Sequence, residues 1–184
     1  MFLLEEQSAK AFLQNGVIQK LVPVEADISI RYIVFEGKQD LEKGIPRKLR
    51  AWLNPKAVFV VVRDQDSEPD CIRLKQRLVS LCQQGGRPDA LVRIVCRELE
   101  SWYLGDLKAV EQGFGLSGLA KKQTKYSHPD RLNNAKQQLN HITNNQYQAM
   151  SGSRAISPYI NIEHNQSQSF QVFINGVRRI INPG

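Results

Sequence analysis

The chain has 184 residues, of which 41% are hydrophobic and 23% charged, the ordinary balance of a globular protein with a sizeable core. No apolar run approaches membrane-spanning length, and two glutamates directly follow the short apolar start, which argues against a signal peptide. Cys71, Cys82 and Cys96 are odd in number and widely spaced, as expected of reduced core residues. We therefore expect a cytoplasmic protein with no membrane partner.

The net charge of +7 is unevenly distributed. Residues 1–107 carry 16 Lys/Arg against 15 Asp/Glu, whereas residues 108–184 carry 9 against 3. The carboxylates and the excess positive charge therefore lie in different parts of the chain. Basic surface beside acidic side chains suits a phosphate-rich polymer such as DNA or RNA, although a merely basic globular protein has the same composition.

The first part of the chain alternates strand-like and helix-like segments. Short apolar or β-branched runs predict strands at residues 1–4, 28–35, 57–63 and 90–96. Helices are expected over residues 8–21, over a segment ending at Trp52 whose better-formed half begins at Pro46, and after Asp70. This alternation predicts an α/β fold: a Rossmann-like parallel sheet of about four strands flanked by helices.

The pattern changes beyond Asp106 and becomes helical. Residues 127–130 (SHPD) resemble a capping box before a helix that carries Leu132, Ala135 and Leu139 on one face. Residues 151–160 suggest a short helix or an ordered loop, and Ser167 is expected to begin a strongly apolar last helix. We expect residues 1–107 to form the α/β core and residues 108–184 a helical C-terminal extension packed on it, within a single structural domain.

The most informative segment is the apolar run 57–63, which ends in two aspartates, Asp64 and Asp66. Side chains alternate along an extended chain, so these two can point the same way from the carboxyl edge of a buried strand. Two adjacent anions favour a hard divalent cation between them. The alternative, that both only begin the next turn and cap the following helix, is weakened by their place after a buried strand.

Acidic clusters follow three of the expected strands. Glu5 and Glu6 come after the first, the Asp-x-Asp pair after the third, and Glu98 and Glu100 after the fourth. Neighbouring parallel strands lie about 5 Å apart, so these carboxylates can converge on one or two metal ions. The pair Glu98 and Glu100 shares a face only if the chain is extended there, and not if a helix has already begun.

Two of these segments resemble the motifs of the Toprim domain, in which a glutamate after the first strand and an Asp-x-Asp after a later strand bind Mg²⁺. The segment 4–10 (LEEQSAK) is similar to the first motif, with Glu5 at the glutamate position and Glu6 where glycine is usual. The segment 64–66 (DQD) matches the second. The resemblance implies a Toprim-like fold in which Glu5, Asp64 and Asp66 hold Mg²⁺ or Mn²⁺.

The chain is most similar to a Toprim-like family of unknown function whose members are often encoded beside ATPases, in the manner of OLD-type nucleases. The segments 35–41 (FEGKQDL), 63–67 (RDQDS), 96–106 (CRELESWYLGD) and 167–170 (SQSF) carry this resemblance over nearly the whole chain. The segment 35–37 (FEG) also mimics the first Toprim motif, with Glu36 in place of Glu5. Glu5 is preferred because the Asp-x-Asp then follows the third strand, as the fold expects.

The resemblance implies Mg²⁺-dependent phosphodiester hydrolysis of nucleic acid. Glu98 or Glu100 would hold a second ion or act as general base. The positively charged candidates for contacts with nucleic acid lie beside the acidic motifs or in a basic segment of the C-terminal part: Lys10, Arg63, Arg97, Lys121, Lys122 and Lys125.

Three functions fit these observations. The first is a Toprim-like nuclease that acts with an ATPase partner, in genome defence or DNA repair. The second is a non-catalytic Toprim-like subunit that binds nucleic acid or a partner protein. The third is a small-molecule phosphotransferase or phosphohydrolase that uses the same acidic site. A binding subunit would tolerate the loss of Asp64 and Asp66, whereas either enzyme would not.

Overall fold

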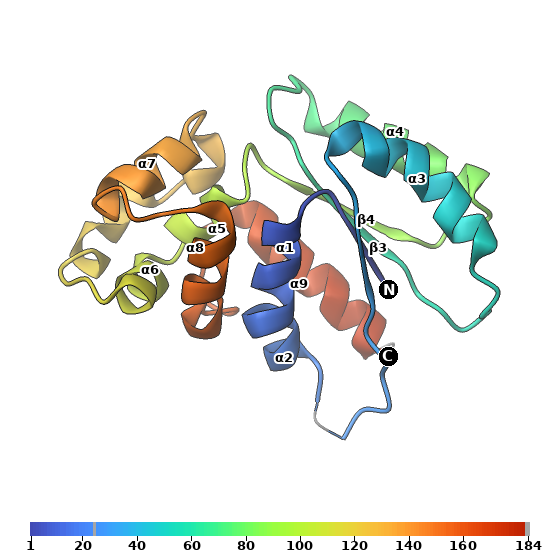
Figure 1. Cartoon of the computed structure of the whole chain (residues 1–184), viewed down its shortest axis with the longest axis horizontal. Helices are drawn as coiled ribbons and strands as arrows, with labels where there is room; N and C mark the ends of the chain where they lie inside the picture. Colours follow the sequence, from blue (N-terminus) through green and yellow to red (C-terminus); the bar gives the residue numbers. More distant parts are fainter. Residues whose placement is uncertain (24, 183–184) are drawn as a thin grey trace.

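The computed structural model describes residues 1–23 and 25–182 of the chain. At its centre is a four-stranded parallel sheet in the order β2-β1-β3-β4 (Figure 1). The strands are β1 (Phe2–Leu4), β2 (Tyr32–Val34), β3 (Val60–Asp64) and β4 (Leu91–Val95). The expected α/β class is therefore confirmed, with a Rossmann-like layout in which helices connect and flank parallel strands.

Helices occupy most of the remaining chain. The first half contains α1 (Gln7–Phe12), a π-helical turn (Leu13–Val17), α2 (Ile18–Leu21), α3 (Lys38–Ala51) and α4 (Cys71–Gln84). The second half contains α5 (Glu100–Leu104), α6 (Leu107–Phe114), 3-10 turns at Ala120–Tyr126, Pro129–Arg131 and Ser157–Tyr159, α7 (Ala135–Ile142), α8 (Ala149–Ile156) and α9 (Gln168–Ile181). No helix in the described ranges is long and apolar enough to cross a membrane.

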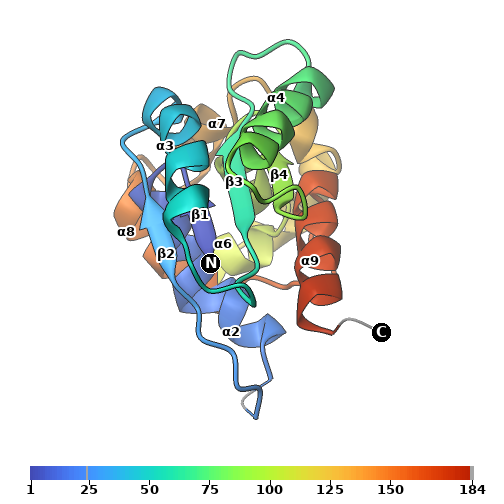
Figure 2. The same ribbon diagram turned by 90° about the vertical axis from the view of Figure 1, so that its right-hand side faces the viewer.

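The sheet is covered on both faces, as its apolar strands require. Helices α3 and α4 pack on one face, and α1, α2 and α9 lie on the other, where α5, α6 and α8 extend the layer (Figures 1 and 2). Alternate residues of β3 serve the two layers: Val61 packs towards α3 and α4, and Val60 and Val62 pack towards α1 and α9. All three are buried, which explains why this segment reads as a continuous apolar run.

Strand β2 is shorter than the segment 28–35 that was expected to form it. It lies at the edge of the sheet and pairs only with β1, from Phe2 opposite Tyr32 to Leu4 opposite Val34. Because β1 is three residues long, β2 has no further partner to pair with. The length of an edge strand is thus set by its neighbour and cannot be found from its own sequence.

The expectation that Pro46 begins the better-formed half of its helix is wrong. Pro46 lies inside α3, which starts eight residues earlier, at Lys38. Proline has no N–H, so the helix gives up the bond to the carbonyl of Glu42. Burial of Leu41, Ile45 and Leu49 against the sheet outweighs that local cost.

The π-helical turn between α1 and α2 coincides with the Asn15-Gly16 interruption of the apolar stripe. A Cβ atom placed on Gly16 would lie 1.9 Å from the carbonyl oxygen of Ser157, so only glycine lets this turn approach the second half of the chain so closely. The helical segment 8–21 expected from the sequence therefore forms, but with a locally widened turn where it meets Ser157.

The capping box expected at residues 127–130 does not begin a helix. This segment forms a 3-10 turn (Pro129–Arg131), and α7 begins only at Ala135. The carboxylate of Asp130 instead accepts hydrogen bonds from the Ser167 hydroxyl (2.6 Å) and the Ser169 N–H (2.6 Å) at the start of α9. Ser167 caps α9 as expected, its hydroxyl accepting from the Phe170 N–H at 3.1 Å.

The two halves of the chain share one apolar core. The ring of Phe12 in α1 lies 4.9 Å from the ring of Tyr103, 6.0 Å from that of Trp102 and 6.1 Å from that of Phe170 in α9. These four aromatic side chains are all fully buried. Residues 108–184 therefore supply part of the layer that covers the sheet, rather than a separately packed unit.

We predict that Phe12→Ala lowers the free energy of unfolding by about 3–5 kcal/mol, because it removes a ring that contacts both halves of the core. Urea denaturation followed by circular dichroism should show one cooperative transition for both proteins. Leu53→Ala is the control: Leu53 is 91% exposed, so its loss should cost less than about 0.5 kcal/mol. Two separate transitions, or equal losses in the two variants, would contradict a shared core.

Candidate metal-binding site at the carboxyl ends of the strands

Glu5 and Asp64 lie on adjacent strands at the carboxyl edge of the sheet. Strand β1 ends at Leu4, which is opposite Val62 of β3, so Glu5 follows β1 at the level of Arg63, one residue before Asp64. Parallel strands bring their carboxyl ends to the same edge, which is where open α/β sheets place ligands. Glu36 follows the outer strand β2 and its side chain is exposed, which favours Glu5 as the glutamate of this edge.

Both carboxyl groups have raised pKa values. Burial, reinforced by the negative charge of Asp66, raises the pKa of Glu5 to about 7, although Arg63 acts in the opposite direction. Burial and the charge of Glu6 raise the pKa of Asp64 well above its usual range, against a hydrogen bond from the Leu99 N–H at 2.9 Å. The edge therefore holds carboxyl groups in a setting that favours either a proton or a bound cation.

Asp66 belongs to this edge, but not for the reason expected from strand alternation. Strand β3 ends at Asp64, and Asp66 adopts a left-handed backbone with φ of 53°. Its N–H donates to the carbonyl of Arg97 at 2.7 Å, which ties the turn after β3 to the turn after β4. The carboxylate of Asp66 lies 3.9 Å from the ammonium group of Lys38, the first residue of α3.

Glu98 and Glu100 do not form a second pair on one face. The two would share a face only if the chain were extended between them. Helix α5 begins at Glu100, so this condition is not met. Glu98 accepts a hydrogen bond from the Lys136 N–H (2.9 Å) at the start of α7. Glu100 is buried and accepts from the Tyr147 hydroxyl at 2.8 Å, and burial raises its pKa. Both carboxylates face the helical half of the chain.

Arg63 was expected to contact nucleic acid, and its position in the structure argues against that role. Its side chain is 1% exposed and lies among three carboxylates: it contacts Glu42, and its nitrogens are 3.8 Å from Glu5 and 4.0 Å from Glu68. Arg77 joins the same network through Glu42 (3.1 Å) and Glu68 (2.8 Å). A buried guanidinium is pinned by these partners and is not free to bind a polymer.

The remaining cationic candidates lie at different places. Lys10 in α1 and Arg97 after β4 are half-buried, and Arg97 has a left-handed backbone with φ of 66°. Lys121, Lys122 and Lys125 are exposed on the 3-10 turn Ala120–Tyr126, with the ammonium group of Lys125 lying 5.5 Å from the Tyr126 ring centre. This turn packs on α6, so the three lysines form a basic surface on the helical half.

The described residues contain no group of three or more His, Cys, Asp and Glu side chains already arranged to hold a metal ion. The contacts above explain this, because the Asp64, Glu98 and Glu100 carboxylates each accept a protein hydrogen bond. Glu5 differs: its buried Oε2 atom has no hydrogen-bond partner among the described residues. That oxygen lies 3.8 Å from the Arg63 Nε, so a metal ion would share it with the guanidinium, and rotation of the Asp64 and Asp66 side chains would have to complete the site.

Several residues of this region were not singled out as site residues from the sequence. After burial, the charge of Glu6 has the largest effect on the pKa of Asp64; the sequence placed Glu6 in the acidic cluster after the first strand, but not among the metal ligands. Lys38 lies in the segment 35–41, shortly after the carboxyl end of β2, and this position could have marked it as a site residue. Glu42 and Tyr147 reach the edge from α3 and from the loop before α8, and no local pattern marks them.

A family model described as a domain of unknown function (DUF4276) matches residues 4–178, nearly the whole chain. No curated protein and no solved structure gives a significant match. The matched range includes Glu5, Asp64, Asp66 and most of the helical half.

We predict that Arg63→Met lowers the free energy of unfolding by about 3–5 kcal/mol, because it leaves Glu5 without a cation and Glu42 and Glu68 with Arg77 alone. Arg73→Met is the matched control: Arg73 forms an ion pair with Asp70, but its side chain is 87% exposed, so the loss should be below about 1 kcal/mol. Chemical denaturation at pH 7 measures both. Equal losses would mean that Arg63 has no structural role.

We predict that Glu5→Gln makes the protein less sensitive to pH. The folded chain holds a proton on Glu5 up to about pH 7, whereas the unfolded chain releases it near pH 4.5, so wild-type stability falls as the pH rises through this window. Relative to the wild type, the variant should gain about 1–2 kcal/mol between pH 4 and pH 8, after allowance for partial solvent exposure. Glu36→Gln, which changes an exposed side chain, should show no such gain in parallel denaturation series.

Proposed function

The chain belongs to the DUF4276 family, and we propose that it is a Toprim-like, Mg²⁺- or Mn²⁺-dependent nuclease that hydrolyses phosphodiester bonds at the carboxyl edge of its sheet. The observation that carries the proposal is the placement of Glu5 and Asp64 on adjacent strands, with raised pKa values and an unpartnered oxygen on Glu5. Such carboxyl groups gain most when a divalent cation replaces the proton.

The Toprim-like relationship rests on arrangement as well as on motifs. A glutamate follows the first strand and an Asp-x-Asp follows the third, and these two strands are neighbours at the centre of the sheet. Glu36, the rival for the first motif, follows the edge strand β2 and points its carboxylate into solvent. The proposal therefore keeps Glu5, Asp64 and Asp66 as the metal ligands.

The roles of the other residues follow from their positions. A bound Mg²⁺ or Mn²⁺ supplies polarisation of the phosphoryl oxygens and activation of water. Lys38, 3.9 Å from Asp66, is placed to neutralise the charge of a phosphate at this edge. The Arg63 Nε lies 3.8 Å from the Glu5 Oε2, the oxygen that has no hydrogen-bond partner among the described residues, so a cation bound there would share Glu5 with the guanidinium. Glu98 and Glu100, turned towards α7 and Tyr147, would connect the edge to the helical half.

Substrate and partners are part of the proposal. Excess positive charge in residues 108–184, with three exposed lysines at 121, 122 and 125, suits the backbone of DNA or RNA. An ATPase partner and a role in cytoplasmic genome defence or DNA repair follow from the resemblance to OLD-type nucleases. A second candidate is a non-catalytic Toprim-like binding subunit, which is favoured by the absence of a ready-made three-ligand cluster in the described residues.

We predict that the purified protein cuts labelled DNA or RNA with Mg²⁺ or Mn²⁺ and not with EDTA, and that Asp64→Asn/Asp66→Asn abolishes cutting. Mutation of a residue that only hydrogen-bonds to a metal ligand typically lowers metal affinity or activity by about 10- to 100-fold. Loss of two ligands should therefore lower the cutting rate by more than about 100-fold. Asp89→Asn removes an exposed aspartate at the other end of the sheet and should leave the rate unchanged. Cutting should rise with pH through about 7, as Glu5 loses its proton.

The same assay separates the alternatives. Equal nucleic-acid binding by wild type and double variant without cutting, also after addition of the ATPase encoded alongside, would favour the binding subunit. Metal-dependent hydrolysis of p-nitrophenyl phosphate without cutting of any nucleic acid would favour a small-molecule phosphohydrolase. Circular dichroism of both variants checks that the substitutions leave the fold intact.

A further inference from the structure

Strand β4 lies at the edge of the sheet and has one unpaired side. In a parallel ladder, the N–H and C=O groups of alternate residues bond to the same neighbour. The Leu91 N–H donates to Phe59 (2.8 Å) and the Val95 carbonyl accepts from Gln65 (2.9 Å), so these odd-numbered residues face β3. The backbone groups of Val92, Ile94 and Cys96 therefore point away from the sheet.

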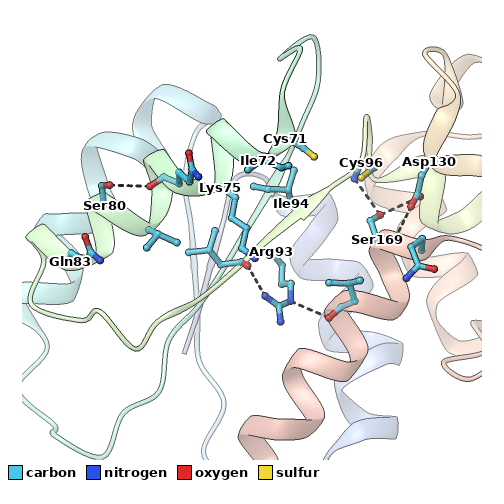
Figure 3. A pocket seen from close by; sticks show the side chains of 15 residues that line it. Cys71, Ile72, Lys75, Ser80, Gln83, Arg93, Ile94, Cys96, Asp130 and Ser169 are labelled. Carbon is cyan, nitrogen blue, oxygen red and sulfur yellow. Dashed lines mark hydrogen bonds between the residues drawn. The ribbon is translucent and has the colours of Figure 1, made fainter.

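These outward-pointing backbone groups of β4 are only partly hydrogen-bonded. The Cys96 N–H donates to the Ser169 hydroxyl at 3.3 Å, and the Val92 carbonyl accepts from the Arg93 guanidinium at 2.9 Å (Figure 3). The N–H and C=O of Ile94 and the N–H of Val92 have no hydrogen-bond partner in the described part of the chain. Unpaired backbone groups of this kind are the template on which another strand adds.

A groove of about 710 Å³ runs along this edge between α4 and α9. Figure 3 shows α4 side chains on one side, the β4 side chains in the middle and α9 on the other side. Two aliphatic side chains form its rims and are unusually exposed: Ile72 of α4 is 65% exposed and Val172 of α9 is 43% exposed. The groove therefore offers apolar surface beside a free strand edge, which is the combination that extended peptides use.

The charges of the groove indicate what it would accept. Lys75 and Arg93 line it, and its one lining carboxylate, Asp130, is already used by Ser167 and Ser169. The Arg93 guanidinium also donates to the carbonyl of Val172 at 3.1 Å, which holds its positive charge at the groove. A second copy of the chain would place these cations against their own counterparts in a protein of net charge +7, so the charges disfavour a homodimer here.

We propose that β4 is a docking edge for an extended acidic segment of a partner protein, in which acidic and β-branched apolar side chains alternate. The segment adds as a fifth strand: its backbone pairs with Val92 and Ile94, its apolar side chains pack between Ile72 and Val172, and its carboxylates meet Lys75 and Arg93. This site lies on the outer edge of the sheet and does not depend on the proposed nuclease activity.

The test uses three labelled eight-residue peptides and the full-length protein. One alternates glutamate and valine, and the second alternates lysine and valine. The third alternates glutamate and proline, which removes every second backbone N–H group together with the valine side chains and disfavours a paired strand. In fluorescence polarisation we expect the Glu/Val peptide to bind about 10-fold or more tightly than either of the others. In hydrogen exchange by NMR, the amides of Val92 and Ile94 should be protected only when this peptide is present.

Two variants locate the binding. Lys75→Glu in α4 and Val172→Glu in α9 should each lower the affinity for the Glu/Val peptide about 10-fold. The control is Arg73→Glu, in α4 but outside the groove, which should change this affinity by less than about 2-fold. Equal affinity for the Glu and Lys peptides, or binding without protection of the two amides, would overturn the proposal. Protection of Ile94 in a self-associated protein without peptide would also overturn it, and would assign the groove to a second copy.

Discussion

The buried guanidinium of Arg63 is the constraint on which the carboxyl edge of this sheet depends. It lies on β3 and pairs with carboxylates that come from the residue after β1, from α3 and from the loop after β3. Several anions cannot be kept out of water in one place unless a cation balances them. Arg63 supplies that balance, and Arg77 adds to it at Glu42 and Glu68. The Arg63 Nε and the Glu5 Oε2 are 3.8 Å apart and neither has a hydrogen-bond partner among the described residues, so this ion pair is held by charge alone.

The helical half of the chain completes this arrangement. Helix α9 and the segment around α5 bury the aromatic core that Phe12 shares with Trp102 and Phe170. The same half brings Tyr147 to Glu100 and the start of α7 to Glu98, so that both carboxylates have hydrogen-bond donors. Residues 108–184 therefore have two physical roles at once: they cover one face of the sheet, and they satisfy the acidic residues after β4 that strand geometry leaves unpaired.

Much of the architecture could be predicted from the sequence, because it is carried by local patterns. The apolar run of β3, the helical segment after Asp70 that forms α4 and the cap at Ser167 each depend on neighbouring residues only. The predictions that were wrong depended on contacts with residues distant in the sequence. Pro46 is tolerated because α3 is buried on the sheet, and Asp130 caps α9 rather than its own segment.

The candidate site also has features that could be predicted from local patterns and features that could not. That Glu5 and Asp64 meet follows from adjacent parallel strands, which the alternation of elements implies. The direction of Asp66 does not follow, because β3 ends two residues earlier and a left-handed residue turns the chain. Nor does the burial of Arg63: an arginine before an Asp-x-Asp suggests a phosphate contact, and only the carboxylates contributed by α3 and the β3–α4 loop reveal that it balances charge inside the protein. Interactions between side chains far apart in sequence decide both cases.

The raised pKa values of Glu5 and Asp64 also limit what kind of ligand this edge accepts. Burial is the main cause of both raised pKa values and neighbouring carboxylates add to it, so an anionic phosphate would increase the repulsion and bind poorly unless a cation came with it. A divalent cation removes that repulsion and presents positive charge to the phosphate at the same time. Binding of cation and phosphate at this edge should therefore be mutually dependent. Lys38 reduces the repulsion only in part, since it lies beside Asp66 and not beside the buried pair.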